Sequence, residues 1–328
     1  MNAPLLSIET LRTVFATEHG EVAAVDGVDL VVERGRTLAV VGESGCGKSM
    51  LSLSIMGLVP RPGRVAGGRV MFEGEDITAL PAQRMRQIRG KRIAMIFQEP
   101  MTSLNPAYTI GFQIVEAIRA HEARSSVAAL RRRAVEALEQ VRMPDAARRF
   151  DDYPHQLSGG MRQRAMIAMA LACGPDLLIA DEPTTALDVT VQAQVLTLLR
   201  DLQAGTGMAI ILVTHDLGVV AEMAADVAVM YAGRVVEHAP TVSLFDDPQH
   251  PYTLGLLGSI PRIEEERARL STIDGAVPPP FAMPSGCRFH PRCVFAREDC
   301  ARRMPPMRSF APRHLAACLY APVEETSR

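Results

Sequence analysis

The feature that most constrains this chain is a glycine-rich octapeptide at residues 42–49, Gly-Glu-Ser-Gly-Cys-Gly-Lys-Ser. It matches the pattern G-x-x-x-x-G-K-[ST], in which glycines let backbone amides turn inward around phosphate groups. An apolar run precedes the loop and a helix-like segment follows it, and a helix amino terminus favours an anion. At roughly 7% glycine usage, the four fixed positions match by chance in only about one chain of this length in a hundred. The octapeptide therefore predicts a phosphate-binding P-loop.

Two side chains of this loop are expected to act directly on a nucleotide. Lys48 would reach the β- and γ-phosphates, and the Ser49 hydroxyl would bind Mg²⁺. The other loop residues would contribute mainly their backbone; they are Gly42, Glu43, Ser44, Gly45, Cys46 and Gly47. The Cys46 side chain need not touch the nucleotide, so we assign it no catalytic role.

The overall composition excludes several classes of protein. The 328 residues carry 35 Lys and Arg against 37 Asp and Glu, a formal net charge of −2, so no basic excess indicates nucleic-acid binding. No apolar stretch approaches the roughly 18–20 residues that a membrane-spanning helix needs. The amino-terminal segment also lacks the basic and apolar regions of a secretory signal. We therefore expect a cytoplasmic protein.

Hydrophobic patterning predicts an α/β core. Four short runs rich in Val, Ile and Leu are typical of strands buried on both faces of a parallel sheet: 37–41, 92–97, 177–180 and 209–213. The stretches 5–9 and 28–33 are expected to form a smaller antiparallel layer. Residues 113–172 have helical periodicity instead, which indicates a helical block inserted into the core.

The carboxy-terminal third has a different composition. Prolines are dense over 278–312, and because proline removes an amide donor and fixes φ, long regular elements are not expected there. We place a domain boundary near residue 238. The predicted organisation is a nucleotide-binding domain over 1–238, with a helical subdomain at about 99–175, and a Cys- and Pro-rich extension over 239–328.

Two adjacent carboxylates close the apolar run at 177–180. Asp181 would hold the Mg²⁺ shell, and Glu182 would polarise the attacking water, which is nearly all that phosphoryl transfer requires. A helix-capping pair is the structural alternative. Beside a P-loop, we favour the catalytic interpretation.

A second anion site is predicted at Leu157–Arg164, with the sequence LSGGMRQR. Ser158 and the amides of Gly159 and Gly160 stand where a helix begins. A chain with one P-loop does not need a second anion site for the same phosphates. We therefore expect this site to face a nucleotide that another subunit binds. A capping serine with a glycine-rich entry turn is the structural alternative.

These pieces, in this order, resemble the ATP-binding cassette (ABC) family, and LSGGMRQR resembles its signature motif. The resemblance covers residues 5 to about 238. It implies that Gln98 contacts Mg²⁺ in the Q-loop, that Ala186-Leu187-Asp188 is the D-loop, that His215 contacts the γ-phosphate, and that Phe15 stacks on adenine. It also implies a RecA-like α/β core and two cassettes packed head to tail. Each ATP would then lie between the P-loop of one cassette and the signature motif of the other.

The extension resembles that of oligopeptide and dipeptide importer ATPases. The similarity lies in Asp247–Thr253, in Leu256–Pro261 and in Gly286–Cys293. It implies two membrane permease subunits, an extracytoplasmic peptide-binding protein and a second ATPase, which is a paralogue or, alternatively, a copy of this chain.

Four cysteines lie near the end of the chain, with the spacing C-x5-C-x6-C-x17-C: Cys287, Cys293, Cys300 and Cys318. In a reducing compartment such a cluster is more typical of metal ligands than of disulfides, and thiolates suit iron–sulfur clusters or Zn²⁺. Buried free thiols are the alternative. The resemblance implies a structural [4Fe-4S] cluster, with Zn²⁺ as the second choice. His290 and His314 are alternative ligands.

The predicted function is ATP hydrolysis that energises import of di- or oligopeptides, by a peripheral subunit on the cytoplasmic face of the inner (cell) membrane. Another small cargo, such as glutathione or a nickel chelate, is one alternative. A soluble ATPase that remodels a macromolecule and a protein that handles metal clusters are two others. No nucleic-acid partner is expected.

Overall fold

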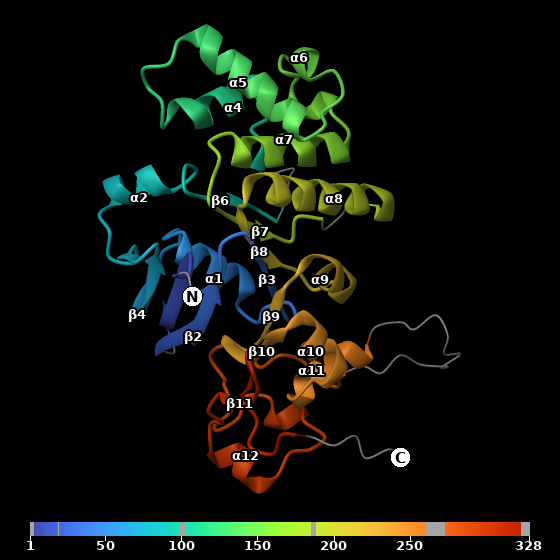
Figure 1. Ribbon diagram of the computed structural model, residues 1–328. Coiled ribbons are helices and arrows are strands. Elements are labelled where there is room, and N and C mark those ends of the chain that lie inside the picture. Colours follow the sequence, from blue (N-terminus) through green and yellow to red (C-terminus); the bar gives the residue numbers. More distant parts are fainter. Residues whose placement is uncertain (1–2, 19, 99–102, 185–187, 260–272, 323–328) are drawn as a thin grey trace. The chain divides into compact units, whose positions relative to one another are not determined.

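The computed structural model describes residues 3–18, 20–98, 103–184, 188–259 and 273–322. The chain divides into two compact units. Most of its helices and strands are labelled in Figure 1. The first unit comprises Met1–Leu5, Val32–Arg36 and Ala79–Val213. The second comprises Leu6–Val31, Thr37–Thr78 and Thr214–Arg328.

A parallel sheet forms the centre of the first unit. Its strands lie in the order β8 (Ala209–Val213), β7 (Leu177–Asp181) and β6 (Ile93–Ile96). Every residue of β7 and β8 is buried, as expected for strands covered on both faces. The unit also contains the short helix α2 (Ala82–Ile88) and the long helix α8 (Val189–Thr206).

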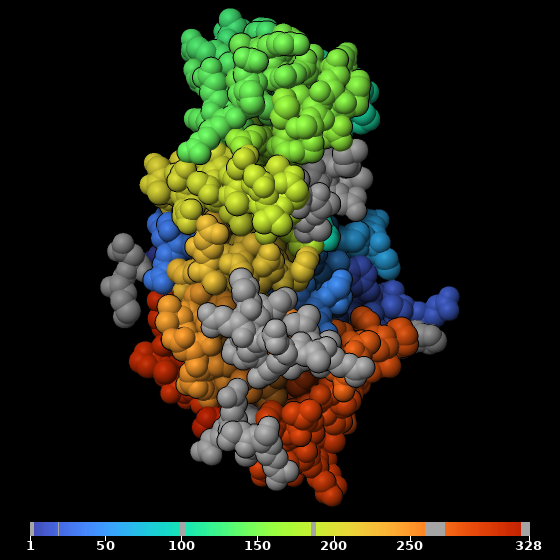
Figure 2. All heavy atoms as spheres, turned by 90° about the vertical axis from the view of Figure 1, so that its right-hand side faces the viewer, coloured from blue at the N-terminus to red at the C-terminus, as the bar shows by residue number. Residues whose placement is uncertain are grey.

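The helical part of the first unit follows β6. It consists of α4 (Ile110–Arg119), α5 (Val127–Gln140), α6 (Ala146–Arg149), the 3-10 turn η1 (Pro154–Gln156) and α7 (Gly159–Leu171). Thr109, Ser126 and Ser158 cap the amino termini of α4, α5 and α7 through their side-chain oxygens. Because Gly111 lacks a Cβ, α4 packs directly on the Phe150 ring. Most of this part of the chain is coloured green in Figure 2.

An antiparallel sheet lies in the second unit. Its strand order is β2 (Gly20–Val32), β1 (Leu6–Thr17), β4 (Gly63–Phe72) and β5 (Glu75–Asp76). The sequence predicted only short parts of β1 and β2. It missed β4, whose three glycines weaken the strand signal in GRVAGGRVMF.

A second run of paired strands in the second unit has the order β3 (Thr37–Val41), β9 (Asp226–Tyr231), β10 (Arg234–Pro240), β12 (His314–Ala316) and β11 (Arg308–Ala311). Strands β3 and β9 are parallel, whereas β10 is antiparallel to both β9 and β12. The unit also holds α1 (Lys48–Ile55) and α9 (Leu217–Met223). The carboxy-terminal residues thus extend the same sheet that carries β3.

The remaining elements of the second unit are short: α10 (Thr241–Asp246), α11 (Pro251–Gly258), η2 (His290–Arg292) and α12 (Glu298–Arg302). Tyr231 of β9 packs against Tyr252 and Phe289, with ring centroids 4.6 and 5.2 Å away. Glu237 is fully buried in β10 and accepts hydrogen bonds from the Gln249 and His250 amides. These contacts fix the extension to the sheet.

The predicted α/β class, with an antiparallel layer and an inserted helical block, is confirmed. The predicted parallel strands match β3, β6, β7 and β8 to within a residue at each end. The boundary near residue 238 remains a prediction. Among the described helices, none has the length and apolar character needed to cross a membrane.

Candidate functional site

The glycine-rich loop joins the buried strand β3 to helix α1 in the second unit. Gly42 and Gly47 have φ angles of +148° and +105°, and both lie against backbone. A Cβ on Gly42 would lie 2.2 Å from the Met230 carbonyl oxygen, and one on Gly47 would lie 2.4 Å from that of Ala24. Only glycine fits such positions without displacing the loop.

The Lys48 side chain folds back into the loop that it terminates. Its Nζ donates to the carbonyl oxygens of Gly42 and Glu43, at 2.7 and 3.0 Å. The residue is buried, so its ammonium group depends on these acceptors. Burial raises the pKa of the neighbouring Cys46 thiol, which therefore stays protonated and supports no catalytic role.

Glu43, the second residue of the loop, is held by residues far along the chain. Its backbone amide donates to the Tyr252 hydroxyl at 2.8 Å. Its carboxylate accepts two hydrogen bonds from Arg292, at 2.6 and 2.9 Å. This bidentate geometry is the strongest form of an arginine–carboxylate pair.

His215 lies in the second unit, between β8 and the amino terminus of α9. The preceding Thr214 amide donates to the Val40 carbonyl at 3.2 Å, which ties this segment to the strand before the loop. His215, Gly42 and Glu43 line one hollow, together with Leu256 of α11. The predicted γ-phosphate contact and the loop thus face the same space.

Phe15 stands in β1, in register with Gly63 of β4. A Cβ on Gly63 would lie 2.6 Å from the Phe15 ring, so the glycine leaves room for the ring on that strand. The predicted stacking on adenine stays a prediction.

The predicted catalytic carboxylates lie in the first unit, at the end of β7. Asp181 is its last residue and is buried. Glu182 follows with a φ of +48°, a conformation that non-glycine residues rarely adopt. Its amide donates to the Val213 carbonyl at 2.9 Å, and its carboxylate accepts from Gln98 Nε2 at 3.0 Å. Gln98 and Glu182 are therefore brought together, and their roles stay predictions.

The signature segment also lies in the first unit, at the start of α7. The Ser158 Oγ accepts from the Met161 amide at 3.4 Å, and a Cβ on Gly159 would meet nothing within 4 Å. Gly160 approaches Val191, in the first turn of α8, whose amide donates to the Asp188 carboxylate at 2.9 Å. The predicted D-loop residues Ala186 and Leu187 lie outside the described residues, as do Ile260 and Pro261 of the extension.

The four clustered cysteines line one cavity in the second unit, together with Phe289 and His290. Burial raises the pKa of Cys287 and Cys318, and raises that of Cys293 to about 11. In the part of the chain that the structure describes, no group of three or more His, Cys, Asp or Glu residues is arranged to hold a metal ion. His314 points elsewhere, since its Nε2 bonds to Glu237 at 2.7 Å.

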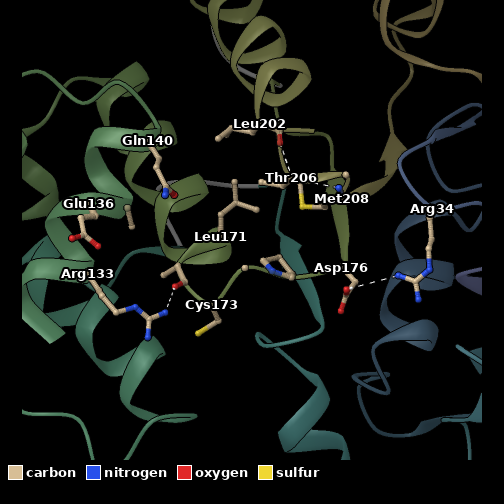
Figure 3. Close-up of a pocket in the computed structure, with 15 residues that line it drawn as sticks. Arg34, Arg133, Glu136, Gln140, Leu171, Cys173, Asp176, Leu202, Thr206 and Met208 are labelled. Atoms are coloured by element: carbon tan, nitrogen blue, oxygen red, sulfur yellow. Dashed lines mark hydrogen bonds and ion pairs between the residues drawn. The ribbon is translucent and has the colours of Figure 1, made fainter. Parts of the chain in front are cut away.

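A separate pocket in the first unit contains none of the predicted site residues (Figure 3). Arg133, Cys173, Asp176 and Thr206 are among its lining residues. We assign no function to it.

The predicted residues thus form two groups. The second unit holds Phe15, the whole loop and His215, and the first holds Gln98, Asp181, Glu182, Asp188 and the signature residues. Sequence reasoning did not identify Tyr252 and Arg292 as loop partners. Both lie within quoted motifs of the extension, but their separations of 209 and 249 residues from Glu43 give no local signal.

A nucleotide-binding cassette is the class that this fold and loop define. The family model described as ABC transporter matches residues 25–185. A second, described as the oligopeptide/dipeptide transporter C-terminal region, matches residues 236–300.

The chain is 53% identical to a Brucella abortus protein whose name describes peptide import and ATP binding, over 96% of this chain and 97% of the relative. It is 47% identical to the dipeptide transport ATP-binding protein DppD of Escherichia coli, over 99% and 98%. Among solved structures, the ATP-binding cassette MJ0796, a dimer bound to ADP and Pi, aligns with a TM-score of 0.65 and 26% identity, over 72% of this chain and 98% of that one. The chain therefore belongs to the ABC transporter family, among the ATP-binding subunits of peptide importers, and ATP and Mg²⁺ are the ligands expected of it.

Proposed function

We propose that this chain hydrolyses ATP to drive import of di- or oligopeptides through a membrane complex, as a peripheral subunit on the cytoplasmic face of the membrane. The observation that carries the proposal is the loop geometry around Lys48, in a chain that is 47% identical to a dipeptide transport ATP-binding protein over nearly its whole length. The buried ammonium group already lies among carbonyl acceptors of the loop, and the phosphates of ATP are the acceptors that it would take instead.

The chemistry is assigned to residues as follows. Loop amides and Lys48 would bind the β- and γ-phosphates, while Ser49, Asp181 and Gln98 would hold Mg²⁺, which supplies charge neutralisation when bound. Glu182 would orient and polarise the attacking water. The Gln98 amide donates a hydrogen bond to the Glu182 carboxylate and so helps to orient it. His215 contacts the γ-phosphate from the segment after β8.

The signature segment is proposed to complete the site of a second cassette. Ser158 and Gly159 are exposed at a helix amino terminus, where backbone amides and the helix dipole favour an anion. Two cassettes packed head to tail would place these residues on the nucleotide held by the partner's loop. The dimeric state of MJ0796 with ADP and Pi supports this arrangement. The partner cassette is a paralogue or a second copy of this chain.

The direct test is the variant Glu182→Gln in the purified transport complex. It removes the water-polarising charge while keeping the size of the side chain, so we expect ATP binding to persist and hydrolysis to fall about 100-fold or more. Dimers of the variant should accumulate with ATP. Glu75→Gln, which changes an exposed carboxylate in β5, is the matched control and should hydrolyse ATP normally. Unchanged turnover in Glu182→Gln would contradict the role assigned to this residue.

Two permease subunits are the proposed membrane partners. Tyr108 and Phe112 stack at 4.7 Å between ring centroids, and nearly half of each residue is exposed. They lie close to Gln98 in the sequence, within the segment of about 98–116 that would receive the permeases. An exposed aromatic pair is typical of a protein-binding surface.

A peptide-binding protein outside the membrane would deliver the cargo, and transport assays with labelled peptides, glutathione and nickel chelates would distinguish the substrates.

The cysteine cavity is proposed to hold a structural [4Fe-4S] cluster, with Zn²⁺ as the alternative. Four thiols from separate segments line it, and sulfur donors suit both metals. Burial disfavours the thiolates, and a bound cation would compensate for that cost. The surrounding segment has little regular backbone pairing, so a crosslink would stabilise it.

Anaerobic purification tests the metal. The protein should be brown and contain iron and sulfide in comparable amounts, and Cys300→Ser should lose both. Cys173→Ser, which changes a cysteine outside the cavity, should keep them. Colourless protein with stoichiometric zinc would contradict the iron–sulfur assignment, and metal-free protein would contradict both.

A further inference from the structure

The P-loop is bonded directly to the carboxy-terminal extension. All three polar groups of Glu43 are engaged: its carbonyl accepts from Lys48, its amide donates to Tyr252, and its carboxylate binds Arg292. Two of these three partners belong to the extension. The loop pattern leaves the residue after its first glycine unspecified, so nothing in the pattern itself requires these contacts.

The Arg292 side chain is held in place by several hydrogen bonds. Its side chain is only 5% exposed, against 30% for Glu43. Its Nε donates to the Asp274 carbonyl at 2.8 Å, and Nη2 donates to the Ile273 carbonyl at 3.2 Å. The Glu43 carboxylate raises the pKa of Arg292 above its ordinary value, so the charge persists at every relevant pH. A side chain with this many fixed contacts can position its partner.

Tyr252 supplies the second attachment. It is fully buried and packs against Tyr231 and Phe289, with ring centroids 4.6 and 5.3 Å away. Tyr231 ends β9, the strand beside β3, from which the loop emerges. The Tyr252 hydroxyl that accepts from Glu43 is therefore fixed relative to the start of the loop.

We propose that Arg292 is a positioning residue for nucleotide binding, which acts through Glu43 on the P-loop. The pair has two effects. It fixes the backbone at Glu43, whose carbonyl helps to hold Lys48, and it neutralises a carboxylate that would otherwise stand beside a triphosphate. The proposal rests on the assignment of this loop to ATP.

The two effects are separable, because only one of them depends on the charge of Glu43. Without Arg292, Glu43 would keep its negative charge and repel the phosphates, because like charges close together disfavour binding. Removing the Glu43 charge as well should restore part of the affinity. Damage to the fold alone would not be repaired by a second substitution at the loop.

The test compares four forms of the full-length chain: wild type, Arg292→Ala, Glu43→Gln and the double variant. The dissociation constant for ATP is measured by titration with a fluorescent ATP analogue. The KM and kcat of ATP hydrolysis are measured in the transport complex. Arg292→Ala should raise the dissociation constant and KM about tenfold, a free-energy change of about 1.4 kcal/mol. Its kcat should stay close to that of wild type, since the water-activating residues are unchanged. The double variant should bind ATP more tightly than Arg292→Ala.

Two further variants control for structural damage. Arg302→Ala removes a largely exposed arginine from the same extension and should bind ATP as wild type does. Arg292→Lys keeps the charge but loses the bidentate geometry, so its affinity should lie between those of wild type and Arg292→Ala.

Two outcomes would overturn the proposal. One is unchanged ATP affinity in Arg292→Ala, and the other is a double variant that binds no better than Arg292→Ala. Failure of the proposed function is distinguishable, because it would appear as absent ATP hydrolysis in the wild-type complex, whatever the extension variants do.

Discussion

The backbone at Glu182 is strained, and this conformation directs the side chain toward Gln98. Glu182 has a φ of +48°, which for an L-residue with a Cβ costs about 1–2 kcal/mol relative to its ordinary conformations. The turn directs its carboxylate to Gln98, 3.0 Å away. Strain of this kind persists where surrounding contacts enforce it, and here the Glu182 amide is bonded to the Val213 carbonyl at the end of β8.

This strain predicts a difference between two substitutions that both remove the carboxylate. Glu182→Gly relieves the steric cost and Glu182→Ala keeps it, so the glycine variant should be more stable by about 1 kcal/mol after its larger chain entropy is counted. The free energy of unfolding, from urea denaturation, measures the difference. Neither variant should hydrolyse ATP. An alanine variant as stable as the glycine variant would show that the backbone is not strained.

Single residues were predictable where a chemical pattern marks them. Lys48, Ser49 and the loop glycines follow from one octapeptide, and Gly42, Gly45 and Gly47 have the positive φ angles that such a loop needs. The partners of Glu43 were not predictable, because a bidentate ion pair between residues 249 positions apart leaves no periodicity or spacing in the sequence.

Among the elements, strand β10 contains a half-buried histidine, His238. His238 pairs with Ala228 of β9 and with Leu315 of β12. Over the chain segments that the structure covers, its Nε2 is buried and has no hydrogen-bond partner. Burial lowers the pKa of His238 below its ordinary value of 6.5. At a pH just below 6.5 the ring is therefore neutral in the folded protein and protonated in the unfolded chain.

This predicts a loss of stability in acid. Between the lowered folded pKa and 6.5 the unfolded state binds the extra proton, so the free energy of unfolding decreases as pH falls below 6.5. His238→Leu removes both the titration and the buried unpaired nitrogen, so it should unfold with less dependence on pH and be about 1 kcal/mol more stable at pH 7. Unfolding curves from pH 4 to 7 measure both effects. His155→Leu, at an exposed position, should leave the pH dependence unchanged. An unaltered profile in His238→Leu would contradict this account.

The predictability of the elements follows from burial. Strands β3, β7 and β8 are buried throughout and apolar except at Thr37 and Asp181, because both faces are covered, and such runs are visible in the sequence. Strand β4 was missed because a half-exposed strand with three glycines has neither an apolar run nor a clear alternation. The pairing of β10 with β12 joins residues more than 75 positions apart, and only the tertiary structure reveals it.

At the scale of the whole molecule, we propose a nucleotide site that one chain does not complete alone. The signature segment at Ser158 and the loop at Lys48 belong to different compact units of this chain. Each is proposed to act on a different ATP, one held by its own loop and one held by the partner cassette. The extension then adds a fixed attachment for the loop through Arg292.

The most direct measurement is the structure of the Glu182→Gln transport complex with ATP and Mg²⁺, determined by electron cryomicroscopy. We expect Ser158 and the Gly159 amide to lie within hydrogen-bond distance of a γ-phosphate whose triphosphate is bound by the loop of the neighbouring cassette. A closed, ATP-loaded complex in which Ser158 touches no nucleotide would contradict the account.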